Sequence, residues 1–455
     1  MPVGKHILLF GAGKSATELI AYLVRACHAH DWTLDIADVR EDLVLSKTQG
    51  DPRTKAHGLD IQAEAGRRRA LIAGADLVIS LLPPNLHYVV ALDCLDAGRH
   101  LLTASYVDER LKALGPAIRE KDLLFLCEMG LDPGIDHMSA LRAIQRVRNA
   151  GGAITAFYSH CGGLVAPESD DNPWHYKISW NSRNVVLAGK GGARFRQASV
   201  EKTIPYAELF DANRQVLIPG LGYLAWYPNR DSLPYASLYG LDQVPTFIRT
   251  TLRHPEFCGG WKQVVHLHLT DERPAYETKG MSLAGFFHRH SERFGFTEWL
   301  HGAGPLSARF QSLLKLSPAE AHLLEQQFLN LGWNSGDPLP EGNHSAADIL
   351  QFALEKKWAL QPRDRDMVVM LHEIHFLSKG CPEVHRSTLV VKGSDSVHTA
   401  MARTVGLPLG IAAVLILQEL ITLRGLHIPI LPEVYDPVLQ HLSLEGITFG
   451  ESESA

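Results

Sequence analysis

Short apolar runs alternate with helical patterns through the first 130 residues. Five runs have the length and composition of buried strands, and they cover 6–13, 33–38, 75–84, 99–106 and 122–130. Between them apolar residues recur at helical spacing, as in 14–30. Strands that alternate with helices form βαβ units, so we expect a Rossmann-type, doubly wound parallel sheet in an α/β fold.

The rest of the chain changes pattern several times. Residues 264–269 and 366–376 alternate like strands, whereas 284–366 is helix-like throughout. In that helical stretch Ser317 and Ser345 have the character of N-caps, and Ser317 is followed by a glutamate three residues on, as in a capping box. An apolar helix is expected within 405–420 and a loop with a final helix within 425–449.

Composition narrows the class of protein. The 455 residues are 45% hydrophobic and 21% charged, which is typical of a globular chain of two or three domains. The net charge of -6 gives no basic excess for nucleic acid or a membrane surface. The apolar run 405–420 contains Pro408 and is shorter than the roughly 20 residues of a membrane span, so a buried helix is expected.

The positions of cysteine and histidine predict reduced thiols in a reducing compartment and no metal-binding site. The six cysteines are dispersed without a CxxC pair, and the N-terminus lacks a signal-peptide pattern, so a cytoplasmic location is expected. His372 and His375 would point to opposite faces of a strand, so no metal site is expected there.

The turn after the first strand carries Gly11, Gly13 and Ala16 in a G-x-G-x-x-A pattern. Gly11 suits the tight turn, Gly13 lets the backbone approach a pyrophosphate, and Ala16 allows close packing of helix on strand. The following helix N-terminus would direct free N–H groups at the phosphates. A dinucleotide cofactor is therefore expected.

Asp38 ends the second strand, where an acidic residue would bind a ribose 2′-hydroxyl. A carboxylate there repels a 2′-phosphate, so NAD is expected, with NADP as the alternative because Arg40 lies two residues on. The other interpretation of Asp38 is a cap for the next helix.

Further candidates follow later strands, where ligands bind in open α/β sheets. Ser105 and Tyr106 fall in a loop where the run 99–106 ends. Asp132-Pro133-Gly134 is a turn signature, and Asp136 is expected to be the N-cap of a helix that begins near His137. In the middle of the chain, Lys177, Arg230 and Arg249 lie in polar, aromatic-flanked segments, although each could be an ordinary surface charge.

Several segments, in order and over nearly the whole chain, resemble the saccharopine dehydrogenase family. They include LFGAGKSA, TASYV, MGLDPGIDHM, HCGGLVAPE, YPNRDSLPY and TAMARTVGLPLGIAA. The resemblance implies a dinucleotide domain at 1–130 that 394–455 completes. It implies an α+β domain for substrate binding and dimerisation at 131–283 and 367–393, with a small helical subdomain at 284–366.

The resemblance also implies a reaction, in which saccharopine, NAD(P)⁺ and water give glutamate and 2-aminoadipate 6-semialdehyde. The implied proton-transfer residues are Asp132, Tyr106 and Cys161. The implied cofactor contacts are Gly11, Gly13, Lys14, Ser15, Ala16, Asp38, Leu82, Pro83, Ser105, Leu131, Asp132 and Asp136. The implied substrate contacts are Ser105, Tyr106, Lys177, Arg230, Arg249, Thr250 and Thr251, where Thr250 replaces a glycine common in the family.

Two other functions stay open at this point. A carboxynorspermidine dehydrogenase shares the fold and some of the motifs. A non-catalytic protein that senses the dinucleotide would keep the glycine turn but turn over no amine. The expected partner is the small-molecule substrate, in a homodimer without nucleic acid or membrane.

Overall fold

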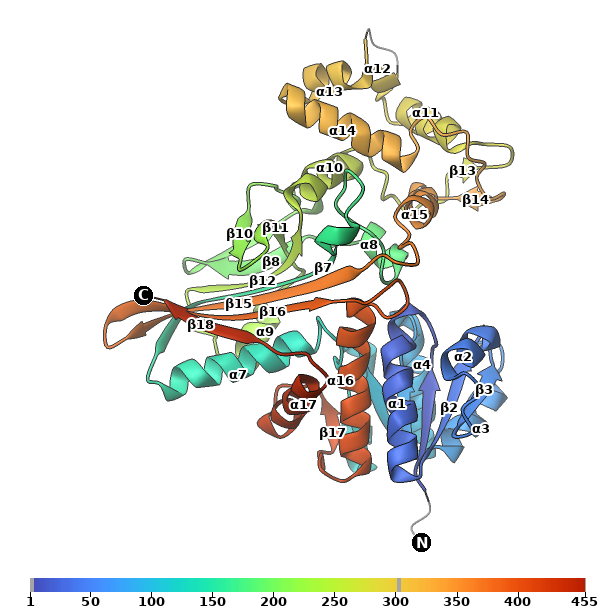
Figure 1. Cartoon of the computed structure of the whole chain (residues 1–455), viewed down its shortest axis with the longest axis vertical. Helices are drawn as coiled ribbons and strands as arrows, with labels where there is room; N and C mark the ends of the chain where they lie inside the picture. Colours follow the sequence, from blue (N-terminus) through green and yellow to red (C-terminus); the bar gives the residue numbers. More distant parts are fainter. Residues whose placement is uncertain (1–3, 301–303, 455) are drawn as a thin grey trace. The chain divides into compact units, whose positions relative to one another are not determined.

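The computed structural model describes residues 4–300 and 304–454 and forms two compact units (Figure 1). Unit 1 comprises 1–155 and 372–455, and unit 2 comprises 156–371. These bounds differ from the expected ones, because 131–155 and 372–393 join unit 1 and the helical stretch 284–366 lies inside unit 2. Residues 301–303 of that stretch lie outside the described residues.

A seven-stranded parallel sheet forms the centre of unit 1. Its strands are β1 (His6–Phe10), β2 (Thr33–Asp38), β3 (Thr54–Gly58), β4 (Leu77–Ser80), β5 (His100–Thr103), β6 (Leu124–Leu126) and β17 (Gly425–His427). Their order is β17-β6-β5-β4-β1-β2-β3. Because β1 lies between β2 and β4, the winding reverses there, and this switch point is where open α/β sheets bind ligands.

Helices cover both faces of this sheet. Leu8, Phe10, Val78 and Phe125 share a core with the helices α3 (Ala65–Gly74), α4 (His87–Ala97), α5 (Glu109–Ala113) and α6 (Gly115–Glu120). On the other face α1 (Thr17–His30) lies beside α16 (Ala400–Leu417) (Figure 1). The expected Rossmann sheet and its completion by the C-terminal segment are confirmed.

Small residues explain how closely α16 approaches α1. A Cβ on Gly406 would lie 2.9 Å from the backbone nitrogen of Leu19, and one on Gly410 would lie 2.7 Å from the Tyr22 ring. By length and composition α16 could cross a membrane, but 89% of it is buried inside the protein. It therefore has the environment of a core helix.

The remaining elements of unit 1 surround this core. They are α2 (Glu41–Thr48), α7 (Ile135–Asn149), α17 (Pro432–Leu444), β16 (Cys381–Lys392), β18 (Gly450–Ser454) and the second half of β15 (Asp366–Ser378). α7 packs against α17, which is why 131–155 belongs to this unit. β18, which the sequence did not predict, pairs antiparallel with β16.

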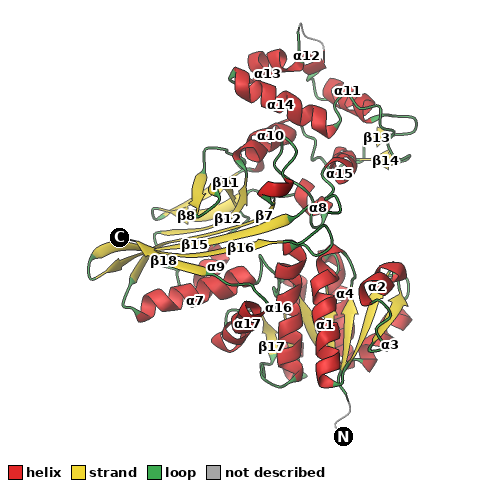
Figure 2. Cartoon of the chain, viewed as in Figure 1, coloured by secondary structure: helices red, strands yellow, loops and turns green. Residues whose placement is uncertain are grey.

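Unit 2 combines a mixed sheet with a layer of helices (Figure 2). Its strands are β7 (Ala153–Val165), β8 (Ala193–Gln197), β9 (Val200–Ile204), β10 (Gln215–Ile218), β11 (Gly222–Pro228), β12 (Thr246–Arg253) and the first half of β15. A two-stranded ribbon adds β13 (Tyr276–Glu277) and β14 (Asn343–His344). β12 pairs parallel with β7 and antiparallel with β11.

The helices of unit 2 pack around aromatic side chains. Trp174, Trp261 and Trp358 are fully buried in one cluster. The helices are α8 (Ser182–Val186), α9 (Leu233–Leu238), α10 (Pro255–His266), α11 (Leu283–Arg293), α12 (Thr297–Leu300), α13 (Leu306–Leu314), α14 (Pro318–Leu331) and α15 (Ala346–Lys357). The expected caps are confirmed, since Ser317 and Ser345 each form a capping box.

Two local predictions are wrong. Residues 264–269 form the end of α10 and a turn rather than a strand, because the alternation of Val, His and Leu also fits the exposed and buried sides of a helix end. α7 begins at Ile135 with Gly134 as its N-cap, so Asp136 lies inside the first turn.

Candidate active site

The glycine turn after β1 leaves room for a cofactor. Gly11 has φ of +102°, and a Cβ there would lie 2.6 Å from the Leu81 carbonyl oxygen, so only glycine fits between β1 and β4. A Cβ on Gly13 would meet no described atom within 4 Å. Lys14 and Ser15 continue into a short 3-10 turn with buried Ala16, ahead of α1. The open space at Gly13 fits a pyrophosphate at a helix N-terminus.

Asp38 faces this turn from the end of β2. Its Oδ2 accepts the backbone N–H of Ala12 at 2.7 Å, and its Oδ1 accepts that of Arg40 at 2.9 Å. Both carboxylate oxygens therefore hold the chain in place. The carboxylate braces the glycine turn, which is a structural role different from the helix cap considered above.

Two cations lie close to Asp38. The exposed Arg40 side chain pairs with Asp42, 2.6 Å away. Lys47, on α2, donates from Nζ to the Gly13 carbonyl. Burial lowers the pKa of Lys47 to about 8, and the charge of Asp38 acts in the opposite direction. Sequence reasoning missed Lys47, because a half-buried lysine on a short helix has no motif of its own.

A chain of hydrogen bonds connects the ends of β4 and β5. Ser80 Oγ lies 2.9 Å from His87 Nδ1, and His87 Nε2 lies 2.7 Å from Ser105 Oγ. Burial lowers the pKa of His87 to about 4, so its ring is neutral at neutral pH. His87 was not singled out in the sequence, and it orients the hydroxyl of the candidate Ser105. Leu82, half-buried, and Pro83, exposed, lie in the loop between Ser80 and His87.

The loops after β5 and β6 meet through Tyr106 and Asp132. The Tyr106 hydroxyl donates to Asp132 Oδ1 at 2.9 Å. Both residues are partly buried, and they form a phenol–carboxylate pair next to the sheet's carboxyl edge. Such a pair can accept and pass on a proton. Two candidates that the sequence placed 26 residues apart are thus brought together.

The turn from Leu131 to Asp136 is buried and tightly packed. Gly134, with φ of +145°, lies so close to the Gly130 backbone that no side chain fits. Asp136 is 1% exposed and accepts the Gly134 N–H at 2.6 Å. His137 Nε2 lies 2.9 Å from Glu128 Oε2. Asp136 therefore holds the turn, and Glu128 and His137 are structural neighbours that the sequence did not reveal.

Cys161 and the two threonines lie on neighbouring strands of unit 2. Cys161 of β7 is opposite Thr251 of β12, and His160 is opposite Thr250. Cys161 is 6% exposed. Thr250 Oγ1 is bonded to His160 Nδ1 at 2.7 Å, both side chains being buried. Thr250 thus uses its hydroxyl within the sheet.

Backbone hydrogen bonds hold the loop that carries Arg230 beside the strand that carries Arg249. The Asn229 N–H donates to the Arg249 carbonyl at 2.8 Å, and the Arg194 N–H donates to the Arg230 carbonyl at 2.9 Å. Arg230 is exposed with φ of +52°, whereas the guanidinium of Arg249 is buried 4.2 Å from the Tyr235 ring centroid. The structure therefore brings two guanidinium-bearing residues to one strand-and-loop region.

Lys177 differs from these arginines. Its Nζ contacts Asp171 and Asp364, each at 2.7 Å, and the side chain is 4% exposed. Burial lowers the pKa of Lys177, but the hydrogen bonds that its ammonium donates to Asp171 and Asp364 outweigh that effect and raise the pKa above the ordinary value. Two carboxylates of the protein already neutralise this candidate.

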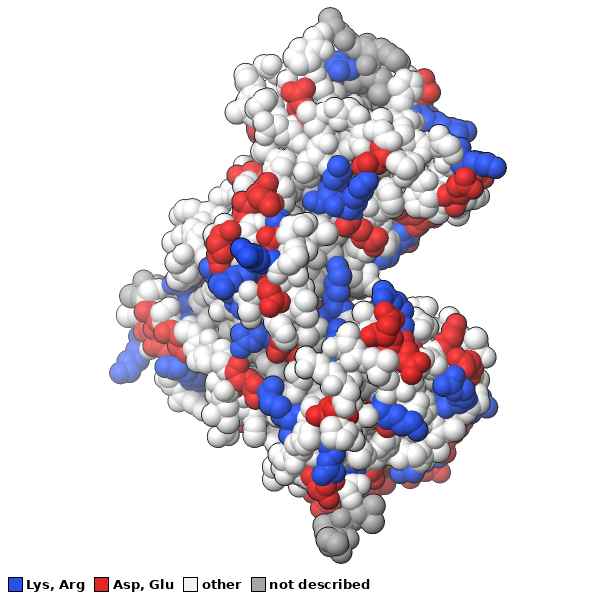
Figure 3. All heavy atoms as spheres, turned by 45° about the vertical axis from the view of Figure 1, so that its right-hand side comes forward, with Lys and Arg blue, Asp and Glu red and all other residues white. Residues whose placement is uncertain are grey.

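All six cysteines are free thiols, and Cys381 is exposed. Among residues 4–300 and 304–454 no group of three or more His, Cys, Asp or Glu side chains could hold a metal. Basic and acidic side chains are interspersed on the face in Figure 3.

Comparisons with known proteins identify the same family in both halves of the chain. Residues 7–125 match the saccharopine dehydrogenase NADP binding domain, and 130–447 match the saccharopine dehydrogenase C-terminal domain. The chain is 32% identical to saccharopine dehydrogenase [NADP(+), L-glutamate-forming] of Schizosaccharomyces pombe, over 98% of each chain. It is 31% identical to alpha-aminoadipic semialdehyde synthase of Arabidopsis thaliana and covers 44% of that protein's length.

Solved structures give the same result for the fold. The apo saccharopine dehydrogenase (L-Glu forming) of Saccharomyces cerevisiae superposes with a TM-score of 0.86 at 29% identity, over 99% of this chain and all of that one. A homospermidine synthase from Legionella pneumophila has a TM-score of 0.58 at 10% identity, so it shares the fold.

Proposed function

The chain belongs to the saccharopine dehydrogenase family, and we propose that it oxidises saccharopine with NADP⁺ and water to glutamate and 2-aminoadipate 6-semialdehyde. The observation that carries this proposal is the similarity over 98% of both chains to a relative named for that NADP⁺-dependent, glutamate-forming reaction.

Saccharopine is a secondary amine with three carboxylates, and its chemistry defines what the protein must do. The secondary ammonium loses a proton, a hydride leaves the carbon beside nitrogen, and water adds to the resulting iminium before the carbinolamine collapses. Bound NADP⁺ supplies the hydride acceptor, while the protein supplies placement and proton transfer.

We assign the proton transfer to Asp132 and Tyr106. The Asp132 carboxylate accepts the proton of the substrate ammonium, and the Tyr106 hydroxyl, 2.9 Å away, keeps that carboxylate oriented. Cys161 is less suited to this role, because it lies on a sheet strand and is 6% exposed. His87, neutral and bonded to Ser105, acts as a positioning residue.

Arg230 and Arg249 bind substrate carboxylates in this proposal. A guanidinium matches a carboxylate with two parallel hydrogen bonds. This role is supported by the exposure of Arg230, which lies in a loop held to β12 and β8 by one backbone hydrogen bond each. Lys177 is left out, since Asp171 and Asp364 occupy its ammonium group.

NADP⁺, rather than the NAD⁺ expected from Asp38, is the cofactor in this proposal. Asp38 uses both carboxylate oxygens on backbone N–H groups, which weakens the argument for a ribose 2′-hydroxyl contact. Arg40 and Lys47 lie beside it and would attract a 2′-phosphate. The matched domain and the fungal relative are both named for NADP.

The experiment is a steady-state assay of the purified chain. We expect saccharopine to be oxidised with kcat/KM higher for NADP⁺ than for NAD⁺, and carboxynorspermidine to be a poor substrate. Turnover of carboxynorspermidine in preference to saccharopine would replace the proposal by the related amine dehydrogenase. Cofactor binding without turnover of either amine would indicate a sensing protein.

The homodimer and the cytoplasmic location stay predictions. Light scattering on the purified chain tests the first. Fractionation of cells that express the chain tests the second.

A further inference from the structure

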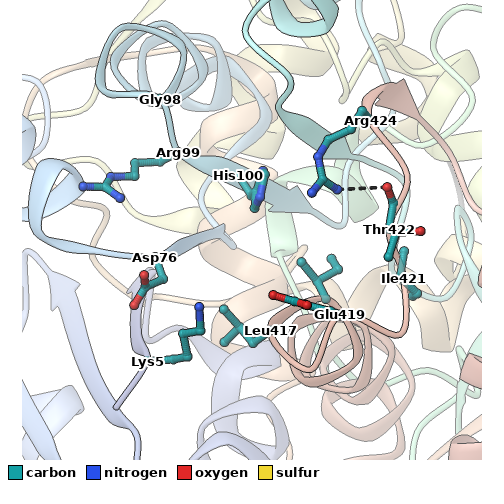
Figure 4. Close-up of a pocket in the computed structure, with 11 residues that line it drawn as sticks. Lys5, Asp76, Gly98, Arg99, His100, Leu417, Glu419, Ile421, Thr422 and Arg424 are labelled. Atoms are coloured by element: carbon teal, nitrogen blue, oxygen red, sulfur yellow. Dashed lines mark hydrogen bonds between the residues drawn. The ribbon is translucent and has the colours of Figure 1, made fainter. Parts of the chain in front are cut away.

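A pocket lies at the opposite edge of the unit 1 sheet from the glycine turn (Figure 4). Lys5 precedes β1, Asp76 precedes β4 and His100 begins β5, so the pocket opens at the amino ends of these strands. β1 has five residues, and at about 3.3 Å per residue the two edges are roughly 17 Å apart. The pocket is therefore separate from the proposed cofactor site.

One wall of the pocket presents hydrogen-bond donors held in fixed positions. The Leu124 N–H donates to His100 Nδ1 at 3.0 Å, so the neutral ring carries its proton on Nε2. Burial, followed by the charge of Arg424, lowers the pKa of His100 and favours that neutral form. Arg424 donates to the carbonyls of Thr422 and Leu423 at 2.9 and 2.8 Å, which orients its guanidinium.

The other side of the pocket carries charges of both signs. In Figure 4 Lys5, Asp76 and Glu419 lie across from His100 and Arg424. In the described part of the chain, the side chains of Lys5 and Glu419 make no hydrogen bond or ion pair. Arg99 also lines the pocket, but its Nη2 donates to the Ala73 carbonyl. Three cations, Lys5, Arg99 and Arg424, therefore line the pocket with two carboxylates, Asp76 and Glu419. Arg424 is also paired outside this lining, with its Nε 3.5 Å from Asp122 Oδ2.

A lining with charges of both signs favours a ligand that carries both signs. A single anion would meet two carboxylates, and a single cation would meet Lys5 and Arg424. Leu417 and Ile421, both buried, add an apolar surface. The pocket volume of about 230 Å³ is below the roughly 300–1,000 Å³ of sites for drug-sized ligands, so the ligand is small.

We propose that this pocket binds a free α-amino acid with an aliphatic side chain. Arg424 and the Nε2–H of His100 bind its carboxylate, Glu419 binds its ammonium group, and Leu417 and Ile421 contact its side chain. Because the pocket and the glycine turn lie at opposite edges of the sheet, the amino acid and the dinucleotide bind without competing. This proposal does not depend on which amine the protein oxidises.

The test is isothermal titration of the full chain with L-leucine, with and without NADPH. We expect one site whose affinity NADPH does not abolish. Arg424→Gln and Glu419→Gln should each weaken binding on the order of 10- to 100-fold, because each removes a hydrogen bond between charged groups. Lys112→Gln, an exposed lysine of the same unit, is the matched control and should bind as the unaltered chain does.

Glu419→Gln is the decisive variant, because Arg424 also holds its own turn through two backbone carbonyls. Absence of L-leucine binding at millimolar concentration overturns the proposal. Acetate or phosphate binding as tightly as L-leucine overturns it in favour of a simple anion site. Binding that survives both substitutions overturns it by placing the ligand elsewhere.

Discussion

The two units use their charged side chains differently around the proposed sites. In unit 1 the acidic candidates accept backbone N–H groups, Asp38 with both carboxylate oxygens and Asp136 with Oδ1, and so shape the turns at which we propose that the cofactor binds. In unit 2 the basic candidates divide, since Lys177 is neutralised by two aspartates while Arg230 is exposed on a held loop. The type of residue indicates a chemistry, but its burial and its position in the fold decide whether a ligand can reach it.

The largest effect is expected for the phenol–carboxylate pair of unit 1. Asp132→Asn removes the proposed proton acceptor, and kcat for saccharopine should fall on the order of 10²- to 10⁴-fold. The Kd for NADPH, measured by fluorescence, should change little. Tyr106→Phe keeps the carboxylate and should cost less. An equal loss of NADPH affinity in Asp132→Asn would make Asp132 part of the cofactor site instead.

Arg230 tests the corresponding claim in unit 2. Arg230→Ala removes a charged hydrogen bond to substrate, so kcat/KM for saccharopine should fall about 10- to 100-fold. Arg230→Lys should restore only part of it, because an ammonium cannot form the two-pronged contact. NADPH affinity serves as the control and should stay constant. Unchanged kinetics in both variants would identify Arg230 as a surface charge.

Substitution of Arg40 tests whether Asp38, at the end of β2, or Arg40 itself sets the preference between NAD⁺ and NADP⁺. Arg40→Ala should raise KM for NADP⁺ about tenfold by removing a hydrogen bond to the 2′-phosphate, and should leave KM for NAD⁺ nearly unchanged. Steady-state kinetics with both cofactors give the answer. A chain that prefers NAD⁺ before substitution would restore the original expectation from Asp38.

Lys47 adds a smaller, pH-dependent contribution at the same place. Because burial lowers its pKa to about 8, Lys47 is charged below that pH and loses its charge above it. KM for NADP⁺ should therefore rise up to about fivefold as pH increases through that value, while KM for NAD⁺ stays flat. Lys47→Arg should remove the dependence. A flat profile in the unaltered chain would exclude Lys47 from phosphate binding.

The smallest effect on activity is expected for Lys177. Lys177→Met should change KM for saccharopine by less than about twofold, while the lost hydrogen bonds to Asp171 and Asp364 lower the free energy of unfolding by about 1–3 kcal/mol. Denaturant unfolding and kinetics on the same sample separate the two. Lys202→Met, at an exposed lysine of unit 2, is the control. A large rise in KM without loss of stability would return Lys177 to the substrate site.

Local patterns predicted much of unit 1. The glycine turn and five of the seven strands of the parallel sheet depend on residues close together in sequence and are confirmed, whereas β3 and β17 were not expected. In unit 2 the two serine caps are confirmed for the same reason. The segment 264–269 shows the limit, because a short alternation cannot separate a strand from a helix end. Pro255 at the start of α10 was the available signal for a helix that ends at His266.

Contacts between distant residues could not be predicted in this way. The partners of Lys177 include Asp364, which is 187 residues away. The hydrogen bonds between Ser105 and His87 and between Tyr106 and Asp132 form only once β4, β5 and β6 lie side by side. The candidate site residues were therefore found by residue type and by resemblance to a family. The structure then distinguishes candidates that hold the backbone in place from candidates that are exposed.

Product analysis tests the central claim most directly. A secondary amine can lose hydride from the carbon on either side of nitrogen, so saccharopine can give glutamate and a semialdehyde, or lysine and 2-oxoglutarate. The purified chain is incubated with saccharopine and NADP⁺, and glutamate, 2-oxoglutarate and NADPH are quantified together. We predict one glutamate per NADPH and no 2-oxoglutarate. Formation of 2-oxoglutarate, or no NADPH at all, would contradict the proposed function.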